Sequence, residues 1–343
     1  MRVECVLRSV LGGLLLVLLL LGGEAVGRSA LAQVAGDVKF AGTDVETIRL
    51  RNKNTVGVIA GDYAGTHLRV VTDLSAVLND GAELRILPVV GLGSVQNVQD
   101  LLFLPGIDIA IVPSDVLDYL KRGGADADLG DRITYIAKLF NEEFHLVAGP
   151  DIATAADLGG RKVSFGPEGG GAAITAQAVF DGLGITVEPV HLDPALALEK
   201  VRSGEIAAMA YVGGKPVDVF SALRREDGYH LLAIDYAEPL RAAYLPGKFT
   251  VEDYPDLVDR GERIATISVG SVLAVYNWTP SSVDRYQRVS RFMAAFLDKQ
   301  DALKQPPRHP KWQEFNAAVV IPGWKRWEPA ARLIGEKPAG GTN

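Results

Sequence analysis

Apolar and polar positions alternate in a repeating order along the chain from Thr55 onward. Short runs rich in β-branched residues are each followed by a stretch whose apolar positions have helical spacing. Near-continuous apolar strands that alternate with helices are typical of a parallel sheet buried between helices. The first block predicts strands at 56–60, 84–90 and 107–112, and helices at 70–78, 95–102 and 115–121.

A second block of the same kind follows and begins with two extended segments, 135–140 and 144–148. Asp193 and Pro194 then start a helix that Gly204 ends, which is the usual order of a capping residue, a first-turn proline and a terminal glycine. The block predicts further strands at 162–165, 207–212 and 229–234, and further helices at 172–183 and 216–223.

A third block consists of the apolar stretch 266–276 and a helix over 281–299. Behind it the tail holds Trp312, Trp324 and Trp327 among several prolines, and we expect it to pack across the surface without building a core. Two α/β units of this size predict a two-lobed protein. We expect the first lobe at 33–147 and 267–343, and the second lobe at 148–266.

The first 32 residues have a different character. Arg2 and Arg8 flank the start of the chain, an apolar run covers 10–21, and Ala30-Leu31-Ala32 supplies an A-x-A site. This order is that of a secretory signal peptide, and the run is shorter than the ~20 apolar residues that span a bilayer. The sequence predicts a cleaved signal peptide at 1–32 and an exported, periplasmic protein. An uncleaved N-terminal anchor is the alternative.

Composition narrows the class of protein. The chain has 343 residues, with 35 Lys+Arg against 42 Asp+Glu and a net charge of −7. This balance disfavours a nucleic-acid-binding protein, which normally has a basic face. The one cysteine, Cys5, falls in the predicted signal peptide, so the sequence excludes an internal disulfide and a C-x-x-C metal site.

Motifs for catalysis are weak. The five histidines have neither H-x-H nor H-E-x-x-H spacing, and no G-x-S-x-G motif occurs. The run 166–171 is rich in glycine but lacks the Lys-Ser/Thr of a phosphate loop. We therefore expect no enzyme, no cofactor and no metal. A secreted hydrolase that uses Ser114, Asp115 and His145 is the alternative.

Glycine, serine or threonine recurs where a predicted strand passes into a helix. In an open α/β sheet these junctions lie at the carboxyl ends of the strands, where ligands bind. Helix starts offer unpaired N–H groups and a partial positive charge, which suit an anion. Simple helix capping by Ser94 and Ser114 is the alternative. The junctions lie at 65–66, 93–94, 113–114 and 169–171.

Several segments together resemble the TAXI solute-binding proteins, which work with TRAP transporters. The resemblance covers roughly 55–301. It is carried by the segments 61–66, Gly93-Ser94-Val95-Gln96-Asn97, 107–115, 143–148, 163–167 with the following glycines, and Tyr211-Val212-Gly213-Gly214-Lys215-Pro216.

The resemblance implies a type II periplasmic-binding fold, with two doubly wound sheets joined by hinge strands. It also implies a small organic acid as ligand, such as an amino acid or a dicarboxylate or keto acid, and a TRAP-type integral membrane permease as partner. A receptor that signals to a membrane sensor is an alternative to transport. The ligand-binding residues that we predict are Thr66, His67, Ser94, Asn97, Ser114, Asp115, Gly169, Gly170, Gly171 and Lys215.

Some of these positions depart from the family's pattern. His67 stands where the family commonly has Tyr, and Pro113 stands where it commonly has Gln. We hypothesise that Lys215, in place of a small residue, pairs with a ligand carboxylate, and a solvated surface lysine is the alternative. Glu143 and His145 flank the first crossing between lobes, where we expect a hinge hydrogen bond and no ligand contact.

Overall fold

The computed structural model describes residues 46, 48, 52–61, 65–81, 83–123 and 128–336. The predicted signal peptide at 1–32 lies outside the described residues. The fold below is that of the compact unit Lys53–Asn343. Among the described helices, none is long and apolar enough to cross a membrane.

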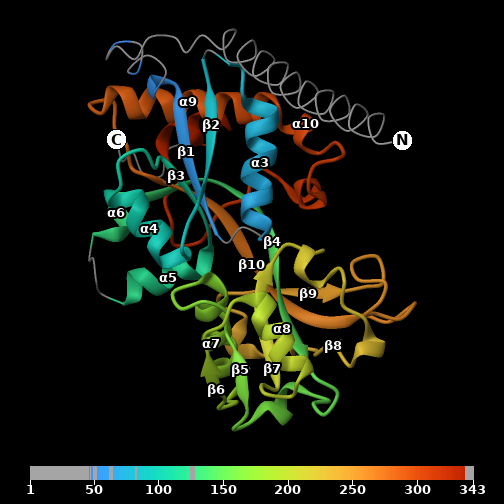
Figure 1. The fold of residues 1–343 in the computed structure, drawn as a ribbon. Coiled ribbons are helices and arrows are strands. Elements are labelled where there is room, and N and C mark those ends of the chain that lie inside the picture. Colours follow the sequence, from blue (N-terminus) through green and yellow to red (C-terminus); the bar gives the residue numbers. More distant parts are fainter. Residues whose placement is uncertain are drawn as a thin grey trace, which may run out of the picture. The chain divides into compact units, whose positions relative to one another are not determined.

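Two groups of parallel strands are linked by two long antiparallel strands (Figure 1). The strands follow the order β2-β1-β3-β10-β4-β7-β5-β6, with β8 paired to β4 and β9 to β10. The group β1–β3 with its helices is called the first half here, and the group β5–β7 with its helices the second half. The strands are β1 (Thr55–Ala60), β2 (Arg85–Val90), β3 (Ile109–Pro113), β4 (Ile133–Ala148), β5 (Lys162–Ser164), β6 (Glu188–Val190), β7 (Ala208–Gly213), β8 (His230–Leu231), β9 (Leu245–Phe249) and β10 (Ile264–Tyr276).

Helices lie between the strands and cover them. The α-helices are α3 (Thr66–Leu78), α4 (Ser94–Phe103), α5 (Ser114–Arg122), α6 (Leu129–Arg132), α7 (Gly171–Leu183), α8 (Pro194–Arg202), α9 (Val283–Asp298), α10 (Gln300–Leu303) and α11 (Glu328–Leu333). The 3₁₀ turns are η1 (Ala155–Leu158), η2 (Asp218–Phe220), η3 (Arg225–Asp227), η4 (Glu238–Leu240) and η5 (Pro310–Glu314).

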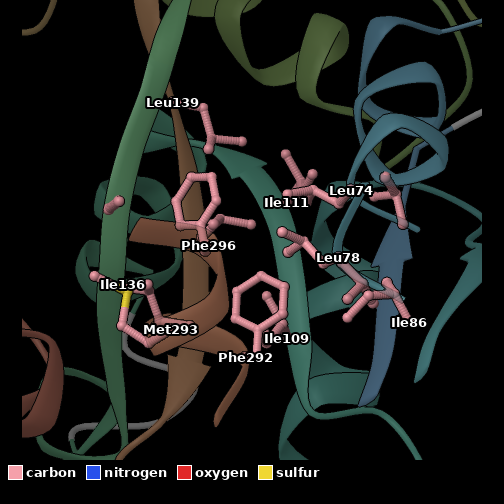
Figure 2. Packing of buried hydrophobic residues seen from close by; sticks show 14 of the residues in the cluster. Leu74, Leu78, Ile86, Ile109, Ile111, Ile136, Leu139, Phe292, Met293 and Phe296 are labelled. Atoms are coloured by element: carbon pink, nitrogen blue, oxygen red, sulfur yellow. The ribbon is translucent and has the colours of Figure 1, made fainter. Parts of the chain in front are cut away.

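The strands of the first half are apolar on both faces because both faces are packed. Successive strand residues point to opposite faces. Ile109 and Ile111 therefore join a cluster with α3 and α9, whereas Ala110 and Val112 join another with α4 and α5. Figure 2 shows the first of these clusters, with Phe292 and the other side chains of α9 against those of β3 and β4. The near-continuous apolar runs in the sequence follow from this double burial.

The hydrophobic core of the first half is separate from that of the second half, and the boundary between them crosses the long strands β4 and β10. The two clusters of the first half end at Phe140 on β4 and begin at Val272 on β10. The two clusters of the second half contain residues from Phe144 to Val269. Between these limits β4 and β10 still pair, with a register shift between Gly270 and Val272. The link between the halves is thus two strands wide and carries polar side chains.

The predicted α/β class is confirmed, and the two predicted sheets are joined into one path by β4 and β10. β1, β2, β3, β5 and β7 and the helices between them lie where the alternation predicts them, whereas β6 was not predicted. The clusters divide between Phe140 and Phe144 on β4 and between Val269 and Val272 on β10, a few residues away from the predicted lobe boundaries at 147/148 and 266/267, which stay a prediction.

Several expectations were wrong. The segments 135–140 and 144–148 form one strand, the helix expected at 216–223 is only the turn η2, and the strand expected at 229–234 is only two residues long. Pro216 and the β-branched residues on either side of Asp218 disfavour helix. The tail is not peripheral, because Trp312 and Trp327 are fully buried in the core of the first half.

Candidate functional site

A cavity of about 100 Å³ lies where helix starts of the two halves meet. Its walls include the first residues of α3 and α4 from the first half and of α7 and α8 from the second half. Tyr211 and Val212 at the end of β7 and Glu142 in the middle of β4 complete it. The carboxyl ends of parallel strands thus supply the site, as the fold class predicts.

Four helices begin here without a side-chain cap. The N-cap residues of α3, α4, α5 and α7 are Gly65, Gly93, Pro113 and Gly170, and no side chain at these positions caps the helix. All four residues line the cavity. Since the first N–H groups of a helix have no partner inside the helix, such ends are anion-binding positions.

The fifth helix start shows the contrast. At the start of α8 the Asp193 side chain accepts a hydrogen bond from the N–H of Ala195 at 2.9 Å, as the sequence predicts. That end is closed by its own carboxylate. The starts of α9 and α11 also lack a side-chain cap but do not line the cavity, so what distinguishes the cavity is that four uncapped starts meet there.

The first residue of α7 lies so close to the first half that it has no room for a side chain. A Cβ on Gly171 would lie 2.9 Å from Cγ of Pro113 and 3.0 Å from Oγ of Ser94. The N–H of Val95 donates to the carbonyl oxygen of Gly169 at 3.1 Å. Close approach between the two halves thus explains the glycine at position 171.

Two ionisable side chains, His67 and Glu142, line the cavity. Nε2 of His67 lies 2.9 Å from Oε2 of Glu142 and 3.2 Å from Oγ of Ser271. Both residues of the pair are buried. No lysine or arginine lines the described part of this cavity, so the partial positive charge of the helix starts is what favours an anion here.

Asp115 lies behind the wall and connects the two halves. Its Oδ2 accepts hydrogen bonds from Thr175 Oγ1 at 2.7 Å and from the Tyr244 hydroxyl at 3.0 Å. Burial raises the pKa of this carboxyl from 3.8 to about 6, although the two hydroxyl donors act in the opposite direction. Asp115 is thus a buried acid between the halves and not a cavity residue.

Half of the predicted site residues line the cavity. Thr66, His67, Ser94, Gly170 and Gly171 do so.

Asn97, Ser114, Asp115, Gly169 and Lys215 are not among the lining residues. The Asn97 amide instead donates to the carbonyl of Ala60 at 3.0 Å. Spacing along a helix start does not reveal which side chains point into a cavity.

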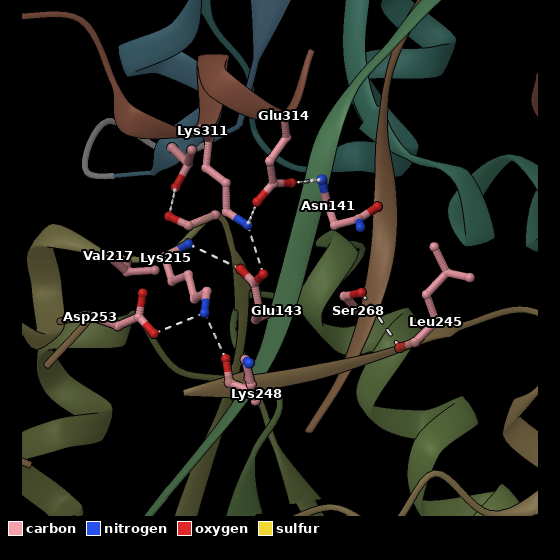
Figure 3. A network of polar contacts seen from close by, with 12 residues as sticks. Asn141, Glu143, Lys215, Val217, Leu245, Lys248, Asp253, Ser268, Lys311 and Glu314 are labelled. Carbon is pink, nitrogen blue, oxygen red and sulfur yellow. Dashed lines mark hydrogen bonds and ion pairs between the residues drawn. The ribbon is translucent and has the colours of Figure 1, made fainter. Parts of the chain in front are cut away.

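Lys215 has partners within the protein. Its Nζ donates to Asp253 Oδ2 at 2.8 Å and to the carbonyl of Lys248 at 2.7 Å, and its N–H donates to Glu143 (Figure 3). The side chain is therefore not a freely solvated surface lysine. Its pairing with a ligand carboxylate stays a prediction, and a ligand would have to compete with Asp253 for the ammonium.

Glu143 and His145 occupy the crossing between the halves, as predicted. His145 Nδ1 contacts the carbonyl of Glu143 at 2.9 Å, and its Nε2 contacts the Tyr254 hydroxyl at 2.7 Å. Burial lowers the pKa of His145 to about 3. The Glu143 carboxylate pairs with Lys311 Nζ at 2.6 Å, also drawn in Figure 3.

The three residues of the hydrolase alternative, Ser114, Asp115 and His145, do not form a catalytic arrangement in the structure. Asp115 is bonded to Thr175 and Tyr244, and His145 is bonded to Glu143 and Tyr254, so these groups form no relay with Ser114. Among the described residues, no group of three or more His, Cys, Asp or Glu could hold a metal ion.

Glu142 is the acidic cavity residue that the sequence analysis missed. It lies in the polar triplet Asn141-Glu142-Glu143, which interrupts an apolar run and which we took for a break between strands. A carboxylate inside a buried strand is itself a signal of a partner or a ligand, because buried charges are rarely left alone.

A model of the NMT1-like family matches residues 59–308. The chain belongs to this family. The match does not test the narrower resemblance to TAXI proteins, which stays a prediction.

Solved structures of binding proteins are also similar to this NMT1-like chain. The periplasmic aliphatic sulphonate binding protein SsuA from Escherichia coli is 16% identical over 83% of this chain and 80% of its own, with a TM-score of 0.46. SsuA from Xanthomonas axonopodis pv. citri, bound to MOPS, is 16% identical over 83% and 81%, with a TM-score of 0.46. A TctC solute binding protein from Polaromonas is 15% identical over 72% and 88%, with a TM-score of 0.38.

Proposed function

We propose that this protein is a solute-binding protein of the periplasmic binding protein type. It captures a small anionic organic solute between its two halves and performs no catalysis. Following the TAXI resemblance, it is exported to the periplasm and delivers the solute to a TRAP-type membrane permease. The observation that carries the proposal is the group of four uncapped helix starts around one cavity.

The anion preference follows from the charges at the cavity. Helix starts carry a partial positive charge and N–H donors. α4 and α7 bring these donors from opposite halves, and neither helix has an acidic residue in its first turn. A carboxylate between them neutralises both helix ends at once.

Closure of the halves supplies the remaining affinity. Micromolar retention requires about 8 kcal/mol, whereas one helix end supplies about 0.3–2 kcal/mol and each charge-assisted hydrogen bond about 1.5–3 kcal/mol. Several contacts from both halves must therefore act together. The polar, two-strand link at Asn141–Glu143 and Val269–Ser271 is the proposed hinge, and the predicted lobes at 33–147 with 267–343 and at 148–266 are the moving bodies.

Thermal unfolding in the presence of a panel of organic acids tests the proposal. We expect at least one acid to raise the melting temperature and small-angle scattering to show compaction with the same acid. A broad panel without any stabilising acid would overturn the proposal.

A matched pair of variants tests the role of the helix starts. Gly65 has the extended backbone of an N-cap, with φ −82° and ψ 155°, so Gly65→Asp places a carboxylate where we place the anion. We expect Gly65→Asp to keep the ligand-free melting temperature, since Asp is a favourable cap. It should also weaken binding of the stabilising acid at least about tenfold, a loss of about 1.4 kcal/mol. Gly65→Asn is the uncharged control and should lose less. Equal losses for both variants would contradict an anion at this position.

A further inference from the structure

Glu142 presents a buried negative charge to the cavity in which we propose that an anion binds. It is 1% exposed and lines the cavity from the centre of β4. Its position belongs to the polar link between the halves, beside Asn141 and Glu143. A carboxylate here repels an anionic solute unless a positive charge lies between them.

The described partners of Glu142 do not saturate it. Oε2 lies 2.9 Å from Nε2 of His67 but has no hydrogen-bond partner among the described residues. The same His67 nitrogen lies 3.2 Å from Oγ of Ser271, which competes for its one proton. An ionised carboxylate accepts up to about four hydrogen bonds, so Glu142 keeps capacity for a donor from the cavity.

The neighbouring acid of the link, Glu143, does not share this property. The Glu143 carboxylate is bonded to Lys311 Nζ at 2.6 Å and to the N–H of Lys215 at 3.1 Å. Asp115 Oδ2 accepts from two hydroxyls and its Oδ1 has no partner among the described residues, but Asp115 does not line the cavity. Among the acids of the link and its surroundings, Glu142 is the one that combines a place in the cavity wall with unused acceptor capacity.

We propose that Glu142 receives a protonated nitrogen of the solute and thereby determines specificity. The solute is then a zwitterion, whose carboxylate lies at the helix starts and whose ammonium lies at Glu142. This inference rests on the proposed function and narrows it. It selects amino-acid-like compounds against the dicarboxylates and keto acids that the sequence analysis left open.

The size of the discrimination follows from the interaction. A hydrogen bond to a charged group contributes about 1.5–3 kcal/mol, which corresponds to roughly 10–150-fold in affinity. A solute without the ammonium loses this contact and leaves Glu142 buried without a cation. A solute with a second carboxylate in its place adds repulsion and should bind more weakly still.

The experiment uses calorimetry on the whole protein with matched sets of compounds. Each set contains an α-amino acid, its 2-hydroxy and 2-keto acids and the acid without the amino group, together with a dicarboxylate of equal length. We expect binding by an amino acid and at least about tenfold weaker binding by its deaminated partners. Glu142→Gln should reduce this preference to within about threefold, because it removes the charge and keeps the shape.

The control variant is Glu188→Gln, on β6, where the side chain is 60% exposed and faces Lys162 at 3.8 Å. It should keep the affinity and the preference of the original protein. The ligand-free melting temperature shows whether Glu142→Gln folds. If it does not, the preference of the original protein for the amino acid over its deaminated partners tests the role of Glu142.

The outcomes separate the two proposals. Binding of a keto acid or dicarboxylate as tight as that of the amino acid, or an unchanged preference in Glu142→Gln, overturns the role of Glu142 and leaves the anion-binding function standing. An absence of binding by every compound overturns the proposed function itself, and the role of Glu142 with it.

Discussion

Asp115 gives a quantitative test of how the two halves pack. Its carboxyl belongs to α5 in the first half, whereas its partners Thr175 and Tyr244 belong to the second half. Burial raises the pKa of this group to about 6 from its ordinary value of 3.8. The residue is 4% exposed, so solvent screens it little. We therefore predict a dependence of stability on pH that originates at this contact.

The sign follows from proton linkage. Below about pH 4 the carboxyl is protonated in both the folded and the unfolded protein, and it adds no pH dependence. Between about pH 4 and 6 the folded protein holds the proton more tightly, so stability falls as the pH rises. At about 1.4 kcal/mol for each pH unit between the two pKa values, the loss is about 3 kcal/mol and is complete at neutral pH.

Asp115→Asn isolates this contribution, because the amide cannot ionise. Urea denaturation of both proteins at several pH values gives the free energies of unfolding, and groups common to both cancel in the difference. We expect the original protein to lose about 3 kcal/mol relative to the variant between about pH 4 and 7.

A constant difference across this range would refute the reasoning. It would mean that the carboxyl is solvated in the folded protein, and hence that α5 and α7 do not pack as described. A change of the opposite sign would refute it as well, since it would require a lowered pKa.

Two further predictions concern the link and the cavity. Lys311 Nζ lies 2.6 Å from Glu143 with both side chains buried, so Lys311→Met should lower the free energy of unfolding in urea by about 3–5 kcal/mol, because it leaves a buried carboxylate alone. Lys325→Met removes a surface ion pair and should cost less than about 1 kcal/mol; similar losses would contradict the buried pair. Gly171→Ala should weaken solute binding in calorimetry at least about tenfold, because its Cβ would overlap the proline before α5. Gly159→Ala meets only an ordinary contact, and an equal loss there would disprove the steric reason.

The alternation of strands and helices was readable from the sequence because its cause is local. Ile109 and Ile111 face one layer of helices and Ala110 the other, so each strand is apolar throughout. The helix starts were also readable, since glycine, serine or threonine directly follows the end of a strand. These signals need no knowledge of distant residues.

The link between the halves could not be predicted from the sequence, because its cause is not local. Glu143 remains in a buried strand because Lys311 neutralises it, and Glu142 lies 2.9 Å from the ring of His67. These partners lie far away in the sequence on both sides, and spacing does not reveal them. Without the partners, two adjacent glutamates in an apolar run indicate a loop.

The tail was misjudged through the same kind of distant contact. Trp312 lies among prolines, but its indole N–H donates to Asp73 Oδ2 at 2.9 Å on α3. A buried indole requires such an acceptor. The acceptor comes from α3, 239 residues earlier in the chain, so the sequence near the tryptophan gives no sign of burial.

The position of β10 between β3 and β4 has a consequence for biogenesis. A growing polypeptide that stops before Ile264 presents β3 and β4 as two unpaired edges, which are prone to association with other chains. The central pairing thus waits until late in synthesis and joins segments far apart in the chain, an arrangement that slows folding. The central part of the sheet therefore cannot form until the chain has been synthesised through β10.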